Sequence, residues 1–292
     1  MTDLITIDGS YGEGGGSIVR LSVALASLLN KKLTVSNIRA NRKKPGLRLQ
    51  HKTGIELIKQ IKNGRVIGAE IGSQTIEYNP QKANNFEESS FFKIKVNTAA
   101  SIGLIFQAVS LSLFKFKRKI TIEISGGATY GQYAPAINYI QEITLNYFKK
   151  FGISSFSIQV NKHDFFPTGG SHVIIEYDPT KSGSPTTFNV NEKRENLQAL
   201  NIFSVASKSL KKSNVADRQA KTLNQRLKVQ FPEIDIISDV KYVISNSSGS
   251  GITLWGGDYP FGSSIVGKRG ISSEKVGTTI FNQFYGDWKR GA

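Results

Sequence analysis

The stretch Ile76–Pro80, which reads IEYNP, recurs almost unchanged as IEYDP at Ile175–Pro179. Each copy closes the same series of expected elements, in which two strands alternate with two helices and a pair of strands follows. This order is typical of mixed sheets with helices packed on one face. We therefore predict an α/β fold of the α+β type, built from repeated βαβαββ units.

Apolar periodicity and turn residues give the bounds of the expected elements. The first copy is expected to hold a strand at Leu4–Asp8, a helix at Ser17–Leu29, a strand at 32–39, a helix at Lys52–Ile61 and strands at 66–72 and 74–80. The second copy is expected to hold a strand at 90–96, a helix at Thr98–Phe114, a strand at 119–125, a helix at Ala136–Phe151 and strands at 155–161 and 171–179.

The remainder of the chain departs from the repeat and then partly returns to it. We predict three parts: two repeats at 1–185, an inserted small α/β subdomain at 186–270, and the start of a third, incomplete repeat at 271–292. The expected elements are a strand at 186–192 (TTFNVNE), a helix at 216–231 capped by Asn214, strands at 239–245 and 251–259, and a helix within 272–291 capped by Ser272 or Ser273.

The chain is strongly basic, with 38 Lys and Arg against 22 Asp and Glu and a formal net charge of +16 in 292 residues. Residues 31–65 hold eleven basic residues and one acid, Glu56. A segment of one sign favours a polyanionic partner, although a solvated surface has the same composition. The absence of cysteine excludes disulfides and thiolate chemistry, and no apolar run is long enough to span a membrane. We expect a cytoplasmic protein with no membrane partner.

A glycine-rich loop follows the first expected strand. It reads DGSYGEGGGSIVR at Asp8–Arg20 and holds five glycines around Glu13. Such a loop lets backbone N–H groups approach a phosphate at a helix start, but it can equally be a tight turn. Glu13 would repel a phosphate unless Mg²⁺ bridges the two groups. Arg20 could form a buried, purely structural ion pair with Glu13, and this role would not exclude a ligand at the loop.

The second strand-to-helix loop carries a cluster of basic residues around the turn-forming pair Pro45-Gly46. Arginine matches phosphate oxygens with two parallel hydrogen bonds, whereas lysine supplies a looser charge. Among the three histidines only His51 lies beside this cluster; His163 lies in a connection between strands, and we interpret His172 as structural. The cluster comprises Arg39, Arg42, Lys43, Lys44, Arg48, Gln50 and His51.

A further glycine-rich loop, GGATYGQYAP at 126–135, holds the corresponding place in the second copy. Its Tyr130, Tyr133 and Pro135 could stack on a nucleobase. The alternative is a well-packed loop that binds no ligand. The sequence shows neither an HExxH-like metal-binding spacing nor a Ser-His-Asp arrangement.

Four motifs in the same order resemble the RNA 3′-terminal phosphate cyclases: DGSYGEGGGSIVR, IRANRKKPGLRLQH, GAEIGSQTIEYNP and FFPTGGSHV. The resemblance covers Asp8 to about Pro179 and resumes at Lys268–Ala292. It implies βαβαββ repeats with a small inserted domain. It also implies a ligase of RNA processing, which converts an RNA 3′-phosphate to a 2′,3′-cyclic phosphodiester with ATP and Mg²⁺ or Mn²⁺. The implied intermediates are an enzyme histidine–AMP and an adenylated RNA end.

The resemblance also implies roles for individual residues. Glu13 would bind the divalent metal, Gln107 would contact the nucleotide and Pro135 would stack on adenine. Two departures from the family pattern are Ser17, where a glutamine is usual, and the altered loop at 126–135. The residues implied to bind or line the phosphates of ATP or RNA are Arg20, Arg39, Arg42, Gln50 and His51.

The family's nucleophilic histidine lies in the final repeat, beyond the position of Ala292, and His51, His163 and His172 do not match it. We expect that a C-terminal segment is omitted from this sequence, which an intact mass well above 32.1 kDa would support. A non-catalytic, cyclase-like RNA-binding protein of ribosome assembly is the alternative function. A small-molecule transferase resembling the enolpyruvyl transferases fits the basic loop less well. Monomer and homodimer stay open as alternatives.

Overall fold

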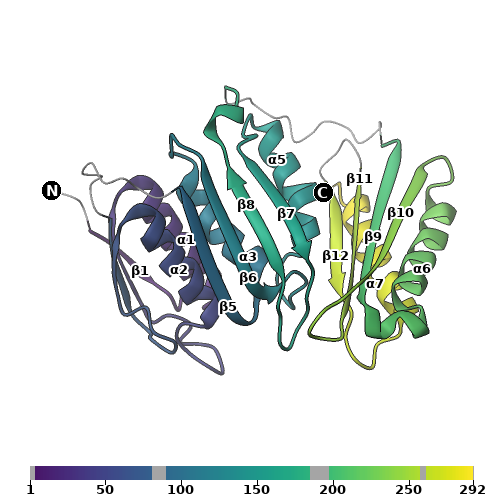
Figure 1. Cartoon of the computed structure of the whole chain (residues 1–292), viewed down its shortest axis with the longest axis horizontal. Coiled ribbons are helices and arrows are strands. Elements are labelled where there is room, and N and C mark those ends of the chain that lie inside the picture. Colours follow the sequence, from purple (N-terminus) through teal and green to yellow (C-terminus); the bar gives the residue numbers. More distant parts are fainter. Residues whose placement is uncertain (1–3, 81–89, 185–196, 257–260, 292) are drawn as a thin grey trace. The chain divides into compact units, whose positions relative to one another are not determined.

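The computed structural model describes residues 4–80, 90–184, 197–256 and 261–291, whose strands form three four-stranded sheets (Figure 1). The chain clusters into two compact units, and each is described by itself. One unit holds the chain up to Ile94 together with Leu104–Ile122, and the other holds Lys95–Gly103 and the chain from Glu123 onward. Among the described residues, no helix is both long and apolar enough to cross a membrane.

The first sheet and its two helices form one βαβαββ repeat. Strands β1 and β2 pair in parallel, and β4 runs antiparallel to both β2 and β3. The helices contact each other and bury residues at helical spacing, such as Val19 and Val23 in the first and Ile55 and Ile58 in the second. The elements are β1 (Leu4–Asp8), α1 (Gly16–Leu29), β2 (Lys32–Ser36), α2 (Leu49–Lys62), β3 (Arg65–Ile67) and β4 (Ile76–Asn79).

The second sheet repeats this series. Its strand order is β5-β6-β8-β7, which matches the order β1-β2-β4-β3 of the first sheet position by position. The predicted α+β fold of repeated βαβαββ units is therefore confirmed. The elements are β5 (Phe91–Ser101), α3 (Ile102–Leu113), β6 (Ile120–Ala128), α4 (Ile137–Tyr139), a π-helical turn (Ile140–Thr144), α5 (Leu145–Lys150), β7 (Phe156–Lys162) and β8 (His172–Tyr177).

Several element bounds differ from the sequence prediction, and the backbone explains two of these differences directly. The strand expected over 66–72 ends at Ile67, because Gly68 and Gly72 take φ values of 77° and 88° and turn the chain. The helix expected from Thr98 begins at Ile102, because β5 continues as a strand through Ser101.

The third sheet has the order β10-β9-β11-β12, with β9 and β10 parallel and β11 antiparallel to both β9 and β12. The strand expected at 186–192 lies outside the described residues. Ser272 caps the last helix, because its hydroxyl accepts the N–H of Lys275, whereas Asn214 makes no side-chain capping bond. The elements are β9 (Ala199–Ser207), α6 (Val215–Gln230), β10 (Asp235–Val243), β11 (Ser250–Gly256), β12 (Gly262–Val266) and α7 (Ser273–Lys289).

Helix α7 packs on α6 and on the third sheet, although we expected residues 271–292 to begin a third core repeat. One hydrophobic cluster joins Leu223 of α6, Ile252 of β11, and Ile280 and Phe284 of α7, all of them fully buried. A helix that shares its core with the preceding strands belongs to their layer. We therefore infer that the inserted subdomain extends through α7.

A second buried cluster joins the loop after β6 to the third sheet, within the same compact unit. Tyr130 and Phe165 pack with Phe203 and Val205 of β9. The hydroxyl groups of Tyr130 and Thr253 are 3.0 Å apart and form a buried hydrogen bond, and burial raises the pKa of Tyr130 above its usual range. Tyr130 is therefore a packing residue, which bears out the interpretation of this part of the loop as well packed.

The carboxylate of Asp164 reinforces this junction. It is fully buried and accepts the backbone N–H groups of Phe165 (2.8 Å), Asn246 (2.8 Å) and Ser247 (3.2 Å). The Nζ of Lys162 lies 4.0 Å from it. A buried carboxylate that accepts three backbone donors fixes the segments that carry them.

Candidate anion-binding site

The glycine-rich loop between β1 and α1 is held by Asp8. The Oδ1 of Asp8 accepts hydrogen bonds from the backbone N–H and the hydroxyl of Ser10, at 2.9 Å and 2.7 Å, and from Asn37 at 3.3 Å. These bonds, led by the backbone N–H of Ser10, lower the pKa of Asp8. Gly12 and Gly14 turn the chain with φ values of 58° and 62°. Helix α1 thus begins at Gly16, directly after these turns.

Helix α1 begins without a side-chain cap. Its N-cap residue is Gly15, which has no polar side chain to accept the first N–H groups of the helix. The positive end of the helix and these open donors favour an anion. A helix start alone does not define a site, but two buried side chains point to the same place.

His51 is the first of these side chains, and it is 1% exposed. Its Nδ1 accepts the backbone N–H of Arg48 at 3.1 Å, so the ring proton of the neutral form lies on Nε2. Burial first, and then the charges of Arg20, Arg39 and Arg48, lowers the pKa of His51 to about 3. The ring is therefore neutral at physiological pH.

The Nε2 of His51 lies against the first turn of α1 and has no hydrogen-bond partner among the described residues. A β-carbon at Gly16 would lie 2.2 Å from this nitrogen and 3.2 Å from a guanidinium nitrogen of Arg20. Only glycine fits this position. The N–H of the buried ring is thus presented at the start of α1, where it can donate to an anion.

Arg20 is the second buried side chain, and it is 6% exposed. Its Nε lacks a hydrogen-bond partner in the part of the chain that the structure describes. Burial, and then the charge of Arg39, lowers the pKa of Arg20 to about 10, which leaves the guanidinium charged at neutral pH. A buried charge without a counter-ion is costly, so the arrangement favours an anionic ligand.

The loop before α2 adds three arginines to the same unit. The guanidinium groups of Arg39 and Arg48 both donate to the carbonyl of Lys44, at 3.4 Å and 3.3 Å. Arg39 takes a left-handed backbone conformation with a φ of 59°. Burial first, and then the charges of Arg48 and Arg42, lowers the pKa of Arg39. Converging arginines that repel one another are stabilised when an anion arrives.

Glu13 pairs with Arg42 and not with Arg20. Its Oε2 lies 2.8 Å from a guanidinium nitrogen of Arg42, and the carboxylate side chain is 80% exposed. The alternative in which Arg20 and Glu13 form an ion pair is therefore wrong. No group of three or more His, Cys, Asp or Glu side chains within the described residues is arranged to hold a metal ion. A metal at Glu13 would need phosphate oxygens and water as its other ligands, which is the usual mode for Mg²⁺.

The other predicted site residues have different surroundings. Gln50 is half-buried in the first turn of α2, in the same unit as the arginines. Gln107 is exposed on α3. Pro135 is half-buried before α4 and belongs to the second compact unit. The described contacts bring neither Gln107 nor Pro135 to the arginines.

The other two histidines make contacts within the second unit. His163 is hydrogen-bonded through Nδ1 to the hydroxyl of Thr129 at 3.0 Å, and burial, followed by the charge of Lys241, lowers its pKa to about 4. The Nε2 of His172 lies 3.0 Å from a carboxylate oxygen of Glu123. The contacts described for these two rings involve neither His51 nor the arginines of the first unit.

These observations define a βαβαββ-repeat protein with a candidate anion-binding site at the start of its first helix. Comparison with known proteins then identifies the family. The family profile described as RNA 3′-terminal phosphate cyclase matches residues 11–248. This chain therefore belongs to the RNA 3′-terminal phosphate cyclase family, which confirms the resemblance seen in the sequence.

Curated relatives that carry the name RNA 3′-terminal phosphate cyclase align over nearly the whole chain. The relative from Archaeoglobus fulgidus is 35% identical over 97% of this chain and 80% of its own length. The one from Methanothermobacter thermautotrophicus is 33% identical over 99% of this chain and 82% of its own length. The one from Thermococcus kodakarensis is 34% identical over 98% of this chain and 80% of its own length.

Proposed function

We propose that this protein converts the 3′-phosphate of an RNA end into a 2′,3′-cyclic phosphodiester in a reaction that consumes ATP. Membership of the cyclase family and the names of the aligned relatives support this activity. The observation that carries it is the start of α1, where two buried donors, Arg20 Nε and His51 Nε2, lack partners among the described residues. Both donors suit a phosphate oxygen.

The residues of this site bind and orient a phosphate dianion in the proposed reaction. Arg20 offers its planar group to two oxygens, and the N–H groups of α1 approach the same anion through Gly15 and Gly16. His51 donates a hydrogen bond without adding charge, because its pKa is held at about 3. Arg39 and Arg42 offset the remaining negative charge, and Gln50 lines the same region.

In the proposed chemistry a histidine attacks the α-phosphorus of ATP and pyrophosphate leaves. AMP then passes to the RNA 3′-phosphate, and the neighbouring 2′-OH attacks that phosphorus and expels AMP. We propose that none of His51, His163 and His172 is the nucleophile. His51 carries its proton on Nε2 and uses Nδ1 as an acceptor, and the other two rings bond to Thr129 and Glu123.

Glu13 would hold a divalent cation, Mg²⁺ or Mn²⁺, that offsets phosphate charge when it is bound. The fit is adequate, because the carboxylate is exposed and only its Oε2 is paired with Arg42. We also propose that Gln107 contacts the nucleotide and that Pro135 stacks on adenine. The accessibility of both side chains is compatible with these roles.

The activity is tested with the protein expressed from its complete gene, ATP labelled at the α-phosphate and an oligoribonucleotide that ends in a 3′-phosphate. We expect an acid-labile, base-stable label on the protein and an RNA end that resists phosphatase. Arg20→Ala should abolish the RNA product, whereas Arg65→Ala, which removes an exposed arginine of β3, should leave it unchanged.

Absence of both label and cyclic end, with tight RNA binding retained, would replace this proposal by the non-catalytic RNA-binding alternative. Equal activity of the Arg20→Ala and wild-type proteins would refute the assignment of the anion-binding site and leave the family assignment intact.

A further inference from the structure

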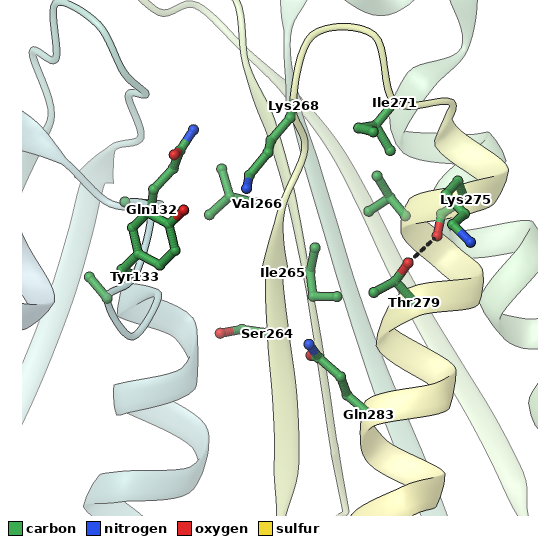
Figure 2. Close-up of a pocket in the computed structure, with 13 residues that line it drawn as sticks. Gln132, Tyr133, Ser264, Ile265, Val266, Lys268, Ile271, Lys275, Thr279 and Gln283 are labelled. Carbon is green, nitrogen blue, oxygen red and sulfur yellow. Dashed lines mark hydrogen bonds between the residues drawn. The ribbon is translucent and has the colours of Figure 1, made fainter.

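A cavity of about 440 Å³ lies between the loop at 131–134, strand β12 and helix α7, all within the second compact unit (Figure 2). We call it the Tyr133 pocket. Its volume is in the range of small-molecule binding sites. The pocket shares no residue with the anion-binding site, which belongs to the first unit. The proposed phosphate and metal contacts therefore leave it unexplained.

Tyr133 is held in an unusual conformation for a ring that makes so little contact. The residue is 94% exposed, and its φ of 57° lies in the left-handed region, which a bulky side chain rarely adopts. Burial does not compensate for this strain, and uncompensated strain is concentrated at ligand-binding positions. Figure 2 shows Tyr133 and Lys268 directed toward the same space, and the Nζ of Lys268 lies 5.6 Å from the ring centroid. The ring thus presents an accessible face.

The rest of the lining suits a flat ligand with polar edges. Ile265 and Val266 of β12 and Ile271 supply apolar surface, and Gln132 and Gln283 supply side-chain amides on opposite sides (Figure 2). Nucleobases combine an apolar face with an edge of donors and acceptors, and proteins bind them by aromatic stacking and side-chain hydrogen bonds. This composition matches a base.

The charge around the Tyr133 pocket is positive. Lys268 and Lys275 line it, and none of the described lining residues is acidic. A neighbouring cavity of about 480 Å³ shares Lys268 and adds Arg269. The adjacent acid, Glu274, is held by two hydrogen bonds from Arg218, at 2.7 Å and 2.9 Å, which lower its pKa to about 2. The surface therefore complements a polyanion.

We propose that the Tyr133 pocket binds one nucleotide of a single-stranded RNA, with the base stacked on Tyr133 and the adjoining phosphate beside Lys268. The inference rests on the proposed function in taking RNA as the partner. It assigns to β12, α7 and the loop at 131–134 the task of holding the RNA strand, separately from the phosphate site on α1.

The test measures the affinity of the full protein for a fluorescent single-stranded oligoribonucleotide with a 3′-phosphate. Tyr133→Ser should weaken RNA binding about tenfold, whereas Tyr133→Phe should bind as the wild type does. Lys268→Ala should weaken binding and make it less dependent on salt. Lys221→Ala, which removes an exposed lysine of α6, is the matched control and should have no effect. Because Tyr133 and Lys268 make little or no contribution to a core, these variants should fold.

A series of oligoribonucleotides, each lacking one base, locates the stacked nucleotide. Loss of the base that occupies the pocket should weaken binding to the wild type and leave binding to Tyr133→Ser unchanged. RNA binding that is independent of Tyr133 would overturn the inference. So would a Tyr133→Ser variant that loses affinity for ATP and keeps its affinity for RNA.

Failure of this inference and failure of the proposed function give different results. A wild type that forms no cyclic end, yet binds RNA through Tyr133, would refute the proposed reaction and support the pocket. A wild type that forms the cyclic end, with RNA affinity unaffected by Tyr133→Ser, would refute the pocket and support the reaction.

Discussion

The imidazole ring of His51 lies directly against the backbone of Gly16. A β-carbon on Gly16 would be only 2.2 Å from Nε2 of this ring. The absence of a side chain at Gly16 is thus what allows a buried histidine to reach the start of α1. Any side chain at this position must displace the ring from the proposed anion-binding site.

Gly16→Ala is therefore expected to weaken ATP binding at least tenfold and to lower the free energy of unfolding by about 1–3 kcal/mol. Isothermal titration and urea unfolding measure the two effects. Gly286→Ala is the matched control, because a β-carbon there meets nothing within 4 Å. In α7 this change should be neutral or stabilise by up to about 1 kcal/mol. A Gly16→Ala protein with wild-type ATP affinity would contradict the placement of His51.

His51 is expected to stay neutral at pH 5, with its proton on Nε2. Its pKa is lowered to about 3, so between pH 6.5 and about 3 the unfolded chain binds a proton that the folded protein does not. Stability should therefore fall as the pH falls through this window. Nitrogen-15 NMR of the ring reports the tautomer, and a doubly protonated His51 at pH 5 would contradict the burial described here. His51→Gln should reduce the acid sensitivity.

Arg20→Met is expected to separate stability from binding. The substitution removes a buried charge that lacks an ionic partner among the described residues, so the unfolding free energy should be unchanged or rise by about 1 kcal/mol or more. ATP affinity should fall at least tenfold, because the planar donor group is lost. Arg65→Met, at an exposed position, should change neither quantity appreciably. A less stable Arg20→Met protein with normal affinity would show that the arginine is structural.

Glu13→Ala is expected to raise the Mg²⁺ concentration needed for half-maximal activity. Stability should change by less than about 1 kcal/mol, because the carboxylate is 80% exposed and its pair with Arg42 is screened by water. Glu70→Ala, which removes another exposed acid of the first unit, serves as the control. An unchanged Mg²⁺ requirement in Glu13→Ala would refute the metal-binding role.

Asp164→Ala is expected to destabilise the second unit by about 3 kcal/mol or more, because three backbone N–H groups lose the buried carboxylate that accepts them. Hydrogen exchange should accelerate at the amides of Asn246 and Ser247. Asp239→Ala, which breaks an exposed pair with Lys241, should cost less than about 1 kcal/mol. Slow exchange that persists in Asp164→Ala would show that other contacts hold this segment.

The repeat could be predicted from the sequence because its signals are local. The periodicity of a strand or helix involves residues that are close in the chain, and the segments IEYNP and IEYDP can be compared directly. They did not predict the position of α7. Helical spacing identifies the apolar face that carries Ile280 and Phe284, but it does not say which sheet that face will cover. The apolar face of α7 packs on the third sheet, and the strands of that sheet lie elsewhere in the sequence, so a local pattern does not reveal this contact.

The basic cluster and His51 were also identified in the sequence, whereas the arginine that forms the ion pair with Glu13 was not. Whether Glu13 meets Arg20 or Arg42 depends on the left-handed turns at Gly12 and Gly14, which set the direction of the loop. The role of Asp164 was missed as well. The sequence did contain one signal of this role. Asp164 lies between His163 and the aromatic residues Phe165 and Phe166, and an acid among such residues can indicate a buried carboxylate.

The packing of Tyr130 and Phe165 on Phe203 has a practical consequence for dissecting the chain. Shortening it after Lys181, to obtain the two repeats alone, would leave these two rings facing water. Aromatic surface uncovered in this way promotes self-association. Strand β9 thus covers aromatic surface of the second repeat, and we expect an isolated pair of repeats to precipitate or to bind chaperones.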